Sequence, residues 1–275
     1  MPPTPPDAGS PREASEIVAW LAGRGPALVA LSGGVDSATV ASLARAALGP
    51  GAVAATVVSG SVSVREIDEA RAVARSVGIR HLLVEAEPLD DERYRANGPD
   101  RCFRCRTVET AALRELGRAE GTKQFLDGIH RDDLGDDRPG IRAMDDAGFS
   151  HPLLWAGWGK AEVRRYARSV ALPNHDRPSN ACLASRVARG EPITAELLGR
   201  VDRAETLLVE RGFRRVRVRV QGNDARVEVD PAELPRLEET VLRSEVTDGL
   251  RALGFARVTI DPRGYPAREP LPVLR

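Results

Sequence analysis

The segment Ser32–Ser37, with the sequence SGGVDS, stands between an apolar run and a stretch with helical periodicity. Glycines at such a junction let the backbone approach an anion closely, and the start of the following helix offers unpaired N–H groups. The hydroxyls of Ser32 and Ser37 add two further donors for phosphate oxygens. The loop lacks the Gly-Lys-Ser/Thr ending of a Walker loop and the spaced glycines of a dinucleotide fingerprint. We predict a phosphate-binding loop; the alternative is a plain strand-to-helix turn.

The three cysteines are a second group of residues whose side chains could take part in chemistry. Cys102 and Cys105 are three residues apart at the start of a predicted helix, so both sulfurs face one side of its first turn. Neighbouring arginines and the helix dipole favour the thiolate form there. Cys182 lies between Arg177 and Arg186 in a separate polar segment.

Three thiols fit some metal centres better than others. A structural zinc takes four ligands, and no histidine stands near these cysteines at ligand spacing. Three thiolates suit an iron–sulfur cluster with one iron open to an exogenous ligand. A redox-active pair and three unrelated buried cysteines remain as alternatives.

The first part of the chain alternates strand and helix patterns, which predicts a doubly wound parallel α/β sheet. The expected strands are 27–31, 52–58, 80–85 and 124–127, and the expected helices are 37–47, 63–77 and 104–119. The polar segment 129–150 is long for a plain connection, and we expect it to be a functional loop.

The pattern changes near residue 189 and predicts a smaller α+β domain. An amphipathic helix is expected over 194–211, a hairpin over 216–220 and 225–229 with its turn at Gly222 and Asn223, a helix over 234–253 and a strand over 256–260. We therefore expect a disordered lead-in at 1–12, an α/β domain at 13–188 and the small domain at 189–275, with an irregular proline-rich tail from Pro262.

Composition narrows the class of protein. The 275 residues carry 40 basic and 40 acidic side chains, so the net charge is zero, which disfavours binding of nucleic acid or membranes through bulk positive charge. Lys123 and Lys160 are the only lysines, and every other basic residue is arginine. No apolar stretch has the length of a membrane helix. The N-terminal sequence lacks the pattern of a secretory signal, and we expect a cytoplasmic protein.

With these features in place, the chain resembles the LarE family, ATP-dependent sulfurtransferases of nickel-pincer cofactor synthesis within the PP-loop ATP pyrophosphatase superfamily. The resemblance extends from about residue 14 to 260. The motifs that carry it are SGGVDS, RCFRCRT, DGIHRDDLGDDRPG, GKAEVRRYA, RPSNACLASR and a C-terminal segment with RVRVRV.

The resemblance implies a two-step reaction on pyridinium-3,5-biscarboxylic acid mononucleotide. ATP, with Mg²⁺, adenylates a carboxylate and pyrophosphate leaves; sulfur then displaces AMP to give a thiocarboxylate. The residues implied in nucleotide and pyrophosphate binding are Ser32, Gly33, Gly34, Asp36, Ser37 and Gly128. Asp36 is also a candidate magnesium ligand.

Cys182 matches the cysteine that handles sulfur in the family, which in some members gives up its own sulfur. In members with two further cysteines, the three thiolates are thought to hold a 4Fe–4S cluster that carries an extra sulfide. The resemblance therefore implies that Cys102, Cys105 and Cys182 hold such a cluster. It also implies site roles in catalysis or in phosphate, metal or substrate binding for Ser185, Arg186, Glu205, Arg217 and Arg219. A homo-oligomer, in hexameric form, is expected to assemble through the small domain.

The chain departs from the family pattern in two places. Ile129 and His130 stand where a small polar pair is expected, and His130 by itself is typical of a loop residue. Arg106 stands where lysine is common. Asp132, Asp133 and Arg138 would serve either the reaction or the ordering of their loop.

Two other functions remain open. A PP-loop tRNA thiolation enzyme also combines such a loop with three cluster cysteines, but it needs an RNA surface that the balanced charge does not favour. A nucleotide-binding module without activity would leave the three cysteines unexplained.

Overall fold

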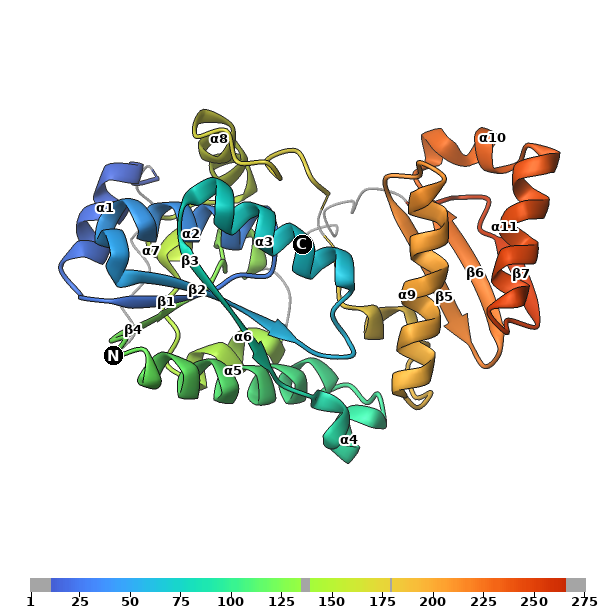
Figure 1. Ribbon diagram of the computed structural model, residues 1–275, viewed down its shortest axis with the longest axis horizontal. Coiled ribbons are helices and arrows are strands. Elements are labelled where there is room, and N and C mark those ends of the chain that lie inside the picture. The colour runs from blue at the N-terminus through green and yellow to red at the C-terminus, as the bar shows by residue number, and fades with distance from the viewer. Residues whose placement is uncertain (1–10, 135–138, 179, 266–275) are drawn as a thin grey trace, which may run out of the picture. The chain divides into compact units, whose positions relative to one another are not determined.

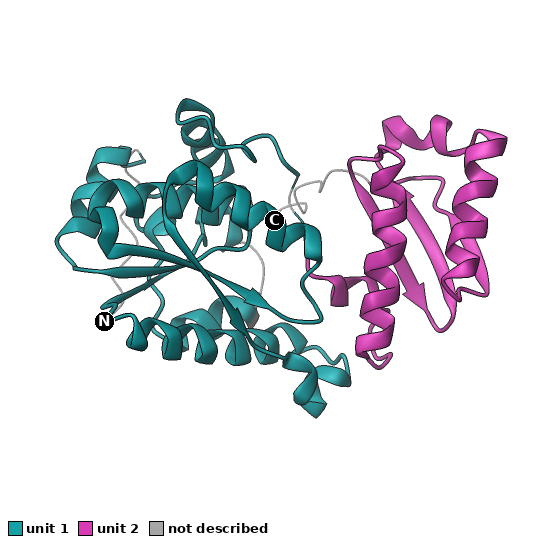
Figure 2. Ribbon diagram, in the orientation of Figure 1, with its two compact units in different colours: residues 1–180 teal, residues 181–275 magenta. Residues whose placement is uncertain are grey.

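The computed structural model describes residues 11–134, 139–178 and 180–265. It divides into two compact units, residues 1–180 and 181–275 (Figure 2). The expected domain boundary was 188/189, so the segment with Cys182 falls in the second unit. Residues 1–10 of the expected lead-in at 1–12, Arg138, and residues 266–275 of the expected tail from Pro262 lie outside the described residues.

The first unit contains a four-stranded parallel sheet in the order β3-β2-β1-β4. Its strands are β1 (Ala27–Ala30), β2 (Ala52–Val58), β3 (Arg80–Glu85) and β4 (Gln124–Leu126). Parallel strands joined by helices on both faces confirm the predicted doubly wound α/β fold (Figure 1). The chain passes from β1 to β2 on one side and from β3 to β4 on the other, which places the topological switch point between β1 and β4.

Helices cover the two faces of this sheet (Figure 1). On one face lie α1 (Ala14–Ala22), α2 (Val35–Leu48), α3 (Val64–Val77) and α8 (Lys160–Ser169). On the other lie α5 (Arg101–Ala119) and α6 (Pro139–Asp146), and the short helices α4 (Glu92–Arg95) and α7 (Pro152–Trp155) complete the unit. The capping box of Ser63 with Glu66 and the left-handed Gly78 set the two ends of α3, which matches the helix expected over 63–77.

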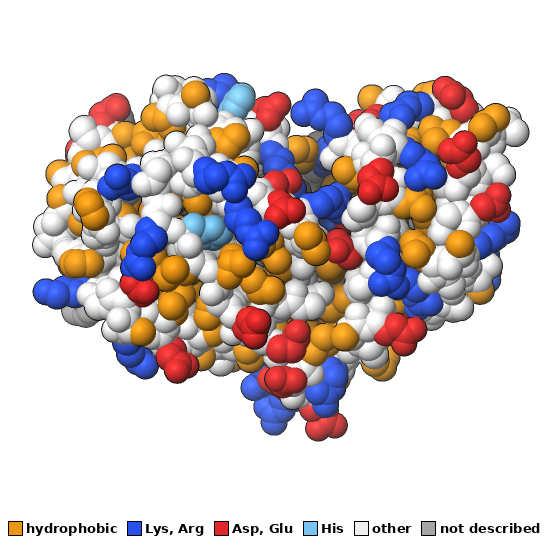
Figure 3. All heavy atoms as spheres, viewed as in Figure 1, with side chains coloured by type: hydrophobic (Ala, Val, Ile, Leu, Met, Phe, Trp, Pro, Cys, Tyr) orange, Lys and Arg blue, Asp and Glu red, His pale blue; other side chains and the backbone are white. Residues whose placement is uncertain are grey.

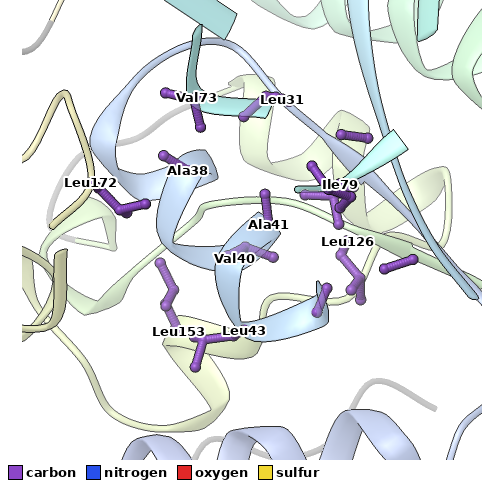
Figure 4. Close-up of a cluster of buried hydrophobic side chains, with 14 of the residues drawn as sticks. Leu31, Ala38, Val40, Ala41, Leu43, Val73, Ile79, Leu126, Leu153 and Leu172 are labelled. Carbon is purple, nitrogen blue, oxygen red and sulfur yellow. The ribbon is translucent and has the colours of Figure 1, made fainter. Parts of the chain in front are cut away.

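The two faces of β1 explain why its run of apolar residues is continuous. Ala27, Val29 and Leu31 point into the core shared with α2, where Val40, Leu43 and Leu153 are also buried (Figure 4). Leu28 points the other way, into a smaller core beneath α5 and α6. A strand buried on both sides needs apolar residues at every position.

The segment 129–150 is only in part the loop that we expected. It contains α6, which packs against α5 through the buried Ala143 and Met144. The few apolar residues of α6 are enough to anchor it because they meet an existing helix, a contact that local sequence does not reveal.

The second unit contains a three-stranded sheet in the order β5-β6-β7, in which β5 and β6 are antiparallel and β6 and β7 parallel. Its elements are α9 (Ala195–Glu210), β5 (Val216–Gln221), β6 (Asp224–Val229), α10 (Leu234–Leu237), α11 (Thr240–Ala252) and β7 (Arg257–Ile260). The hairpin turn lies at Gly222 and Asn223, as predicted.

The helix expected over 234–253 is two helices. Glu238 is the C-cap residue of the first helix, and Glu239, with φ of −56° and ψ of 127°, is the N-cap residue of the second, without a side-chain cap hydrogen bond. The apolar periodicity continues through both helices, with Leu237, Val246 and Leu250 buried, so it did not reveal the break.

Candidate active site

The loop Ser32–Ser37 connects β1 to α2 at the carboxyl end of the sheet. Gly33 has a φ of +79°, and a Cβ there would lie 2.9 Å from the carbonyl oxygen of Glu66. Ser37 Oγ accepts from the Ser32 N–H at 3.1 Å and donates to the Gly34 carbonyl at 3.1 Å. These contacts fix the backbone of the loop at the N-terminus of α2, where N–H groups favour an anion.

Gly128 follows β4 and lies against this loop. A Cβ at Gly128 would be 2.7 Å from the Ser37 nitrogen and 2.8 Å from the carbonyl carbon of Asp36. The chain after β4 therefore passes the start of α2 at a distance that only glycine permits. This contact lies at the switch point, the place where open α/β sheets bind their ligands.

Asp36 lies in the first turn of α2 and is paired with Lys160, the first residue of α8. Lys160 Nζ donates to both carboxylate oxygens of Asp36 at 2.7 Å. His130 Nε2 is 3.6 Å from Asp36 Oδ1, and His130 is only 6% exposed. His130 is thus a buried neighbour of the loop, which the sequence did not indicate.

Two buried polar atoms around the loop have no hydrogen-bond partner: Asp127 Oδ2 and Asn174 Oδ1. Their residues are 5% and 6% exposed. A third buried polar atom, His130 Nδ1, lies 3.4 Å from Asp133 Oδ2. Asn174 Nδ2 donates to the Gly33 carbonyl at 2.7 Å, so this side chain touches the loop itself. Because buried polar atoms are almost always paired, such a group of unpaired atoms indicates a ligand site.

His151 bridges two carboxylates close to Gly128, at the end of β4. Its Nδ1 is 2.7 Å from Asp127 Oδ1 and its Nε2 is 2.8 Å from Asp145 Oδ1. Burial is the largest single influence and lowers the pKa of His151, but the hydrogen bonds and charges of Asp127 and Asp145 together outweigh it and raise the pKa to about 9. The imidazolium form therefore holds Asp127, the residue before Gly128, at neutral pH.

Cys102 and Cys105 lie in the first turn of α5, as predicted, and neither they nor Cys182 form a disulfide. An Arg101 guanidinium nitrogen is 4.0 Å from Cys102 Sγ, and Cys105 Sγ donates to Glu109 Oε1 at 3.4 Å. Both cysteines are partly exposed.

In the second unit, Cys182 immediately precedes the 3-10 helix Leu183–Arg186. The Arg186 guanidinium donates to the Cys182 carbonyl at 2.9 Å and to Ser185 Oγ at 3.0 Å. It also makes a bidentate pair with Glu205 at 2.8 and 2.9 Å, in which both side chains are almost completely buried. Glu205 Oε1 also accepts from the Val218 N–H at 3.0 Å. Arg186 and Glu205 therefore hold the Cys182 turn against α9 and β5.

Arg217 and Arg219 extend from one face of β5. Arg219 pairs with Glu228 at 3.1 Å and donates to the Ser185 carbonyl at 3.0 Å. Arg217 is 6% exposed, and its guanidinium stacks 4.7 Å from the centre of the Tyr265 ring. Burial, and then the charge of Arg186, lower the pKa of Arg217. A buried arginine with a lowered pKa gains stability from an anion, so this is not an ordinary solvated strand face.

The structure brings together the predicted residues within each unit. In the first unit the candidate nucleotide-binding residues lie together, and Cys102 and Cys105 lie close to each other on α5; the candidates are Ser32, Gly33, Gly34, Asp36, Ser37 and Gly128. Cys182, Ser185, Arg186, Glu205, Arg217 and Arg219 gather in the second. Among the described residues, no group of three or more His, Cys, Asp or Glu side chains has an arrangement that could hold a metal ion.

Comparisons with known proteins agree with this geometry. The family profile described as NAD synthase matches residues 22–100, which include the loop and the first three strands. The chain is 41% identical over 239 residues to the uncharacterized protein slr1717 of Synechocystis, which covers 87% of this chain and 89% of the relative. It is 31% identical over 238 residues to the pyridinium-3,5-bisthiocarboxylic acid mononucleotide synthase of Lactiplantibacillus plantarum, with 86% of each chain covered. The chain belongs to the LarE family.

In this LarE-family chain, three residues that the sequence analysis did not assign to the site contact the loop Ser32–Ser37. Lys160 lies within GKAEVRRYA, His130 within the segment after β4, and Asn174 in the connection after α8. The rarity of lysine was a usable signal for Lys160, because all other basic residues but one are arginine. No comparable signal marked Asn174, since its role depends on a contact with Gly33.

Figure 3 shows basic and acidic side chains interspersed over the visible face of each unit. This distribution matches the balanced composition. No helix among the described residues has the length and apolar character needed to cross a membrane.

Proposed function

We propose that this protein is an ATP-dependent sulfurtransferase that converts a carboxylate of pyridinium-3,5-biscarboxylic acid mononucleotide into a thiocarboxylate. The observation that carries the proposal is the SGGVDS loop at the β1/β4 switch point, closed on one side by Gly128 and bordered by two unpaired buried polar atoms, Asp127 Oδ2 and Asn174 Oδ1. The relationship to the Lactiplantibacillus plantarum synthase supports the choice of substrate.

The first step is adenylation of the substrate. A carboxylate is a poor electrophile, because its oxygen is a poor leaving group. In the proposed step a carboxylate oxygen attacks the α-phosphorus of ATP, the bond to the β-phosphate breaks, and pyrophosphate leaves. The N–H groups at the start of α2 and the hydroxyls of Ser32 and Ser37 stabilise the departing charge.

Magnesium fits this loop in its chemistry. Mg²⁺ is commonly held by one or two carboxylates together with phosphate oxygens and water, so a three-residue protein cluster is not required. Asp36, at the first turn of α2 with its side chain 28% exposed, is the carboxylate we assign to it.

The second step replaces oxygen by sulfur. A sulfur nucleophile attacks the carbonyl carbon of the adenylate, and AMP leaves with the bonding electron pair. Cys182 is the residue we assign to sulfur handling, with Ser185 beside it and Arg186 holding its turn. Arg217 and Arg219 provide positive charge for an anionic group of substrate or nucleotide.

The donor set of Cys102, Cys105 and Cys182 suits a 4Fe–4S cluster, because three thiolates leave one iron open. When bound, such a cluster would supply an exchangeable sulfide, so that Cys182 is not consumed. The roles of the chain itself are to present two sulfurs from the first turn of α5 and one from the Cys182 turn.

One experiment tests the reaction. Protein purified without oxygen is incubated with ATP, Mg²⁺, sulfide and the pyridinium mononucleotide, and pyrophosphate and nucleotide products are measured by mass spectrometry. We expect pyrophosphate release that depends on the substrate, and a product in which one oxygen is replaced by sulfur. Absence of pyrophosphate release, or binding of labelled tRNA in preference to the mononucleotide, would reject the proposal.

A second measurement tests the cluster. Iron and acid-labile sulfide are quantified in the wild-type protein and in Cys102→Ser and Cys182→Ser variants. We expect both variants to lose most of the iron. Wild-type protein that turns over without iron while Cys182 becomes dehydroalanine would show instead that the cysteine gives up its own sulfur.

A further inference from the structure

The pair between Lys160 and Asp36 occupies the carboxylate that we assign to magnesium. Lys160 Nζ is 2.7 Å from each oxygen of Asp36, and the two side chains are 27% and 28% exposed. His130 Nε2 lies 3.6 Å from one of the same oxygens. In the absence of a ligand, therefore, the charge of Asp36 is already compensated by the protein.

At this position the charge of Lys160 does not stabilise its own helix. Lys160 is the first residue of α8, where the partial positive charge of the helix N-terminus disfavours a cation. The chain uses arginine at all but two of its 40 basic positions, yet it has a lysine here. An ammonium is a compact point charge that can rotate between partners, whereas a guanidinium is a planar fork suited to one fixed pairing. A residue that goes against local preference in this way indicates a role in function.

The backbone of Lys160 is held firmly beside the loop. Its N–H donates to Asp132 Oδ2 at 2.8 Å, and the N–H of the preceding Gly159 donates to Glu162 Oε2 at 2.8 Å. Further along α8, Tyr166 contacts Ser42 of α2 through an oxygen–oxygen distance of 3.1 Å. Because α8 is anchored on α2, only the four-carbon side chain of Lys160 is left to move.

We propose that Lys160 exchanges partners when the nucleotide binds. A divalent cation cannot take Asp36 while an ammonium holds both carboxylate oxygens, since the two cations repel each other and compete for the same lone pairs. When ATP enters with its metal, the metal takes Asp36 and Lys160 turns to a phosphate oxygen. Lys160 thus blocks metal binding in the empty site and binds phosphate in the filled one. This inference rests on the proposed ATP function.

The exchange predicts effects of opposite sign for one substitution. Lys160→Met keeps the length of the side chain and removes its charge. We expect the nucleotide-free variant to bind Mn²⁺ about tenfold more tightly than wild type, measured by electron paramagnetic resonance, because Asp36 is released. We expect the same variant to bind α,β-methylene-ATP with Mg²⁺ about 10–100-fold more weakly, measured by calorimetry, because a charged contact to phosphate is lost.

Matched variants separate this role from a general effect on folding. Lys123→Met makes the same chemical change just before β4, at the opposite end of the strands from the loop, and should alter neither affinity. Asp36→Asn should remove the gain in Mn²⁺ affinity when combined with Lys160→Met, because the gain acts through that carboxylate. Lys160→Arg should keep Mn²⁺ binding weak. Circular dichroism melting curves confirm that each variant is folded.

The outcomes distinguish a failure of the proposed exchange from a failure of the proposed ATP function. If Lys160→Met leaves Mn²⁺ affinity unchanged, or if its gain persists in the Asp36→Asn background, the exchange is wrong even where the ATP analogue still binds. If the wild-type protein binds no ATP analogue, the proposed function itself is wrong. The Mn²⁺ measurement without nucleotide then still shows whether Lys160 blocks Asp36.

Discussion

Close packing restricts substitution at single residues, both in the proposed nucleotide site and in the second unit. The approach of Gly128 to the backbone of Asp36 and Ser37 leaves no space for a side chain. In the second unit, the paired side chains of Arg186 and Glu205 are almost completely buried. In each case the neighbouring atoms are backbone or a buried charge. Adjustment of the structure around a substitution therefore costs free energy.

Gly128→Ala should disrupt the loop. The new Cβ would meet backbone atoms at 2.7 and 2.8 Å, so either α2 or the chain after β4 must shift. We expect ATP-analogue affinity to fall at least tenfold and stability to fall by about 1–3 kcal/mol, measured by calorimetry and urea unfolding. Gly23→Ala is the control, because its Cβ would have one neighbour at 3.9 Å. Equal effects of the two substitutions would contradict the prediction.

Arg186→Met should destabilise the second unit. It leaves the Glu205 carboxylate buried without its cation, and loss of one partner of a buried pair typically costs about 3–5 kcal/mol. The double variant Arg186→Met with Glu205→Leu should regain part of this loss, because no charge stays buried. Guanidinium unfolding of the three proteins measures both effects. A loss below about 1 kcal/mol in the single variant would show that the pair is not structural.

At the scale of elements, ion pairs at element ends join parts of the fold that are distant in sequence. His151 links the end of β4 to α6 through Asp127 and Asp145. The start of α8 is joined to the start of α2 through Lys160 and Asp36. These links explain why the segments that follow β1 and β4 are held in place although they lie outside the sheet.

The His151 link should make stability depend on pH. The folded-state pKa, about 9, lies above the unfolded value of about 6.5. The contribution of the imidazolium is therefore fully present below about pH 6.5 and is lost as the pH rises through 9. Urea unfolding measures the difference in free energy of unfolding between wild type and His151→Gln. This difference should be about 2–3 kcal/mol larger at pH 6 than at pH 9.5. A difference that does not change over this range would show that His151 is not held as an imidazolium.

At the scale of the whole molecule, the two compact units have separate cores and carry different parts of the proposed chemistry. The first holds the phosphate loop and the cysteine pair of α5; the second holds Cys182 and the arginines of β5. Assembly into a hexamer through the second unit stays a prediction from the family resemblance, and light scattering of the purified protein tests it.

Separate cores predict separate unfolding transitions. A ligand that binds the first unit should raise the transition temperature of that unit only. At a ligand concentration of 100 times Kd, it adds about 2.7 kcal/mol to the free energy of unfolding of that unit. Differential scanning calorimetry with α,β-methylene-ATP and Mg²⁺ measures this shift, and Arg186→Met should instead lower only the other transition. One transition that moves as a whole in both experiments would contradict the prediction.

The sequence by itself determined the architecture of the first unit and the place of the loop. Buried parallel strands require continuous apolar runs, and helix ends require specific caps, so 27–31 and Ser63–Gly78 could be recognised locally. The spacing of Cys102 and Cys105 likewise placed both in one helical turn. The break at Glu239 and the helix at 139–146 could not be recognised, because neither changes the local apolar pattern.

Only the tertiary structure decided which polar residues meet. Lys160 is 124 positions from Asp36, and Asn174 is 141 positions from Gly33, yet both pairs are in hydrogen-bond contact. Arg217 is a further example. The alternation of arginine and valine along β5 is typical of a strand with one solvated face, yet the Arg217 side chain is buried against Tyr265. Local sequence specifies backbone conformation through short-range sterics and hydrogen bonds. Charge compensation and burial depend instead on which distant segments the fold packs together, and so they became visible only in three dimensions.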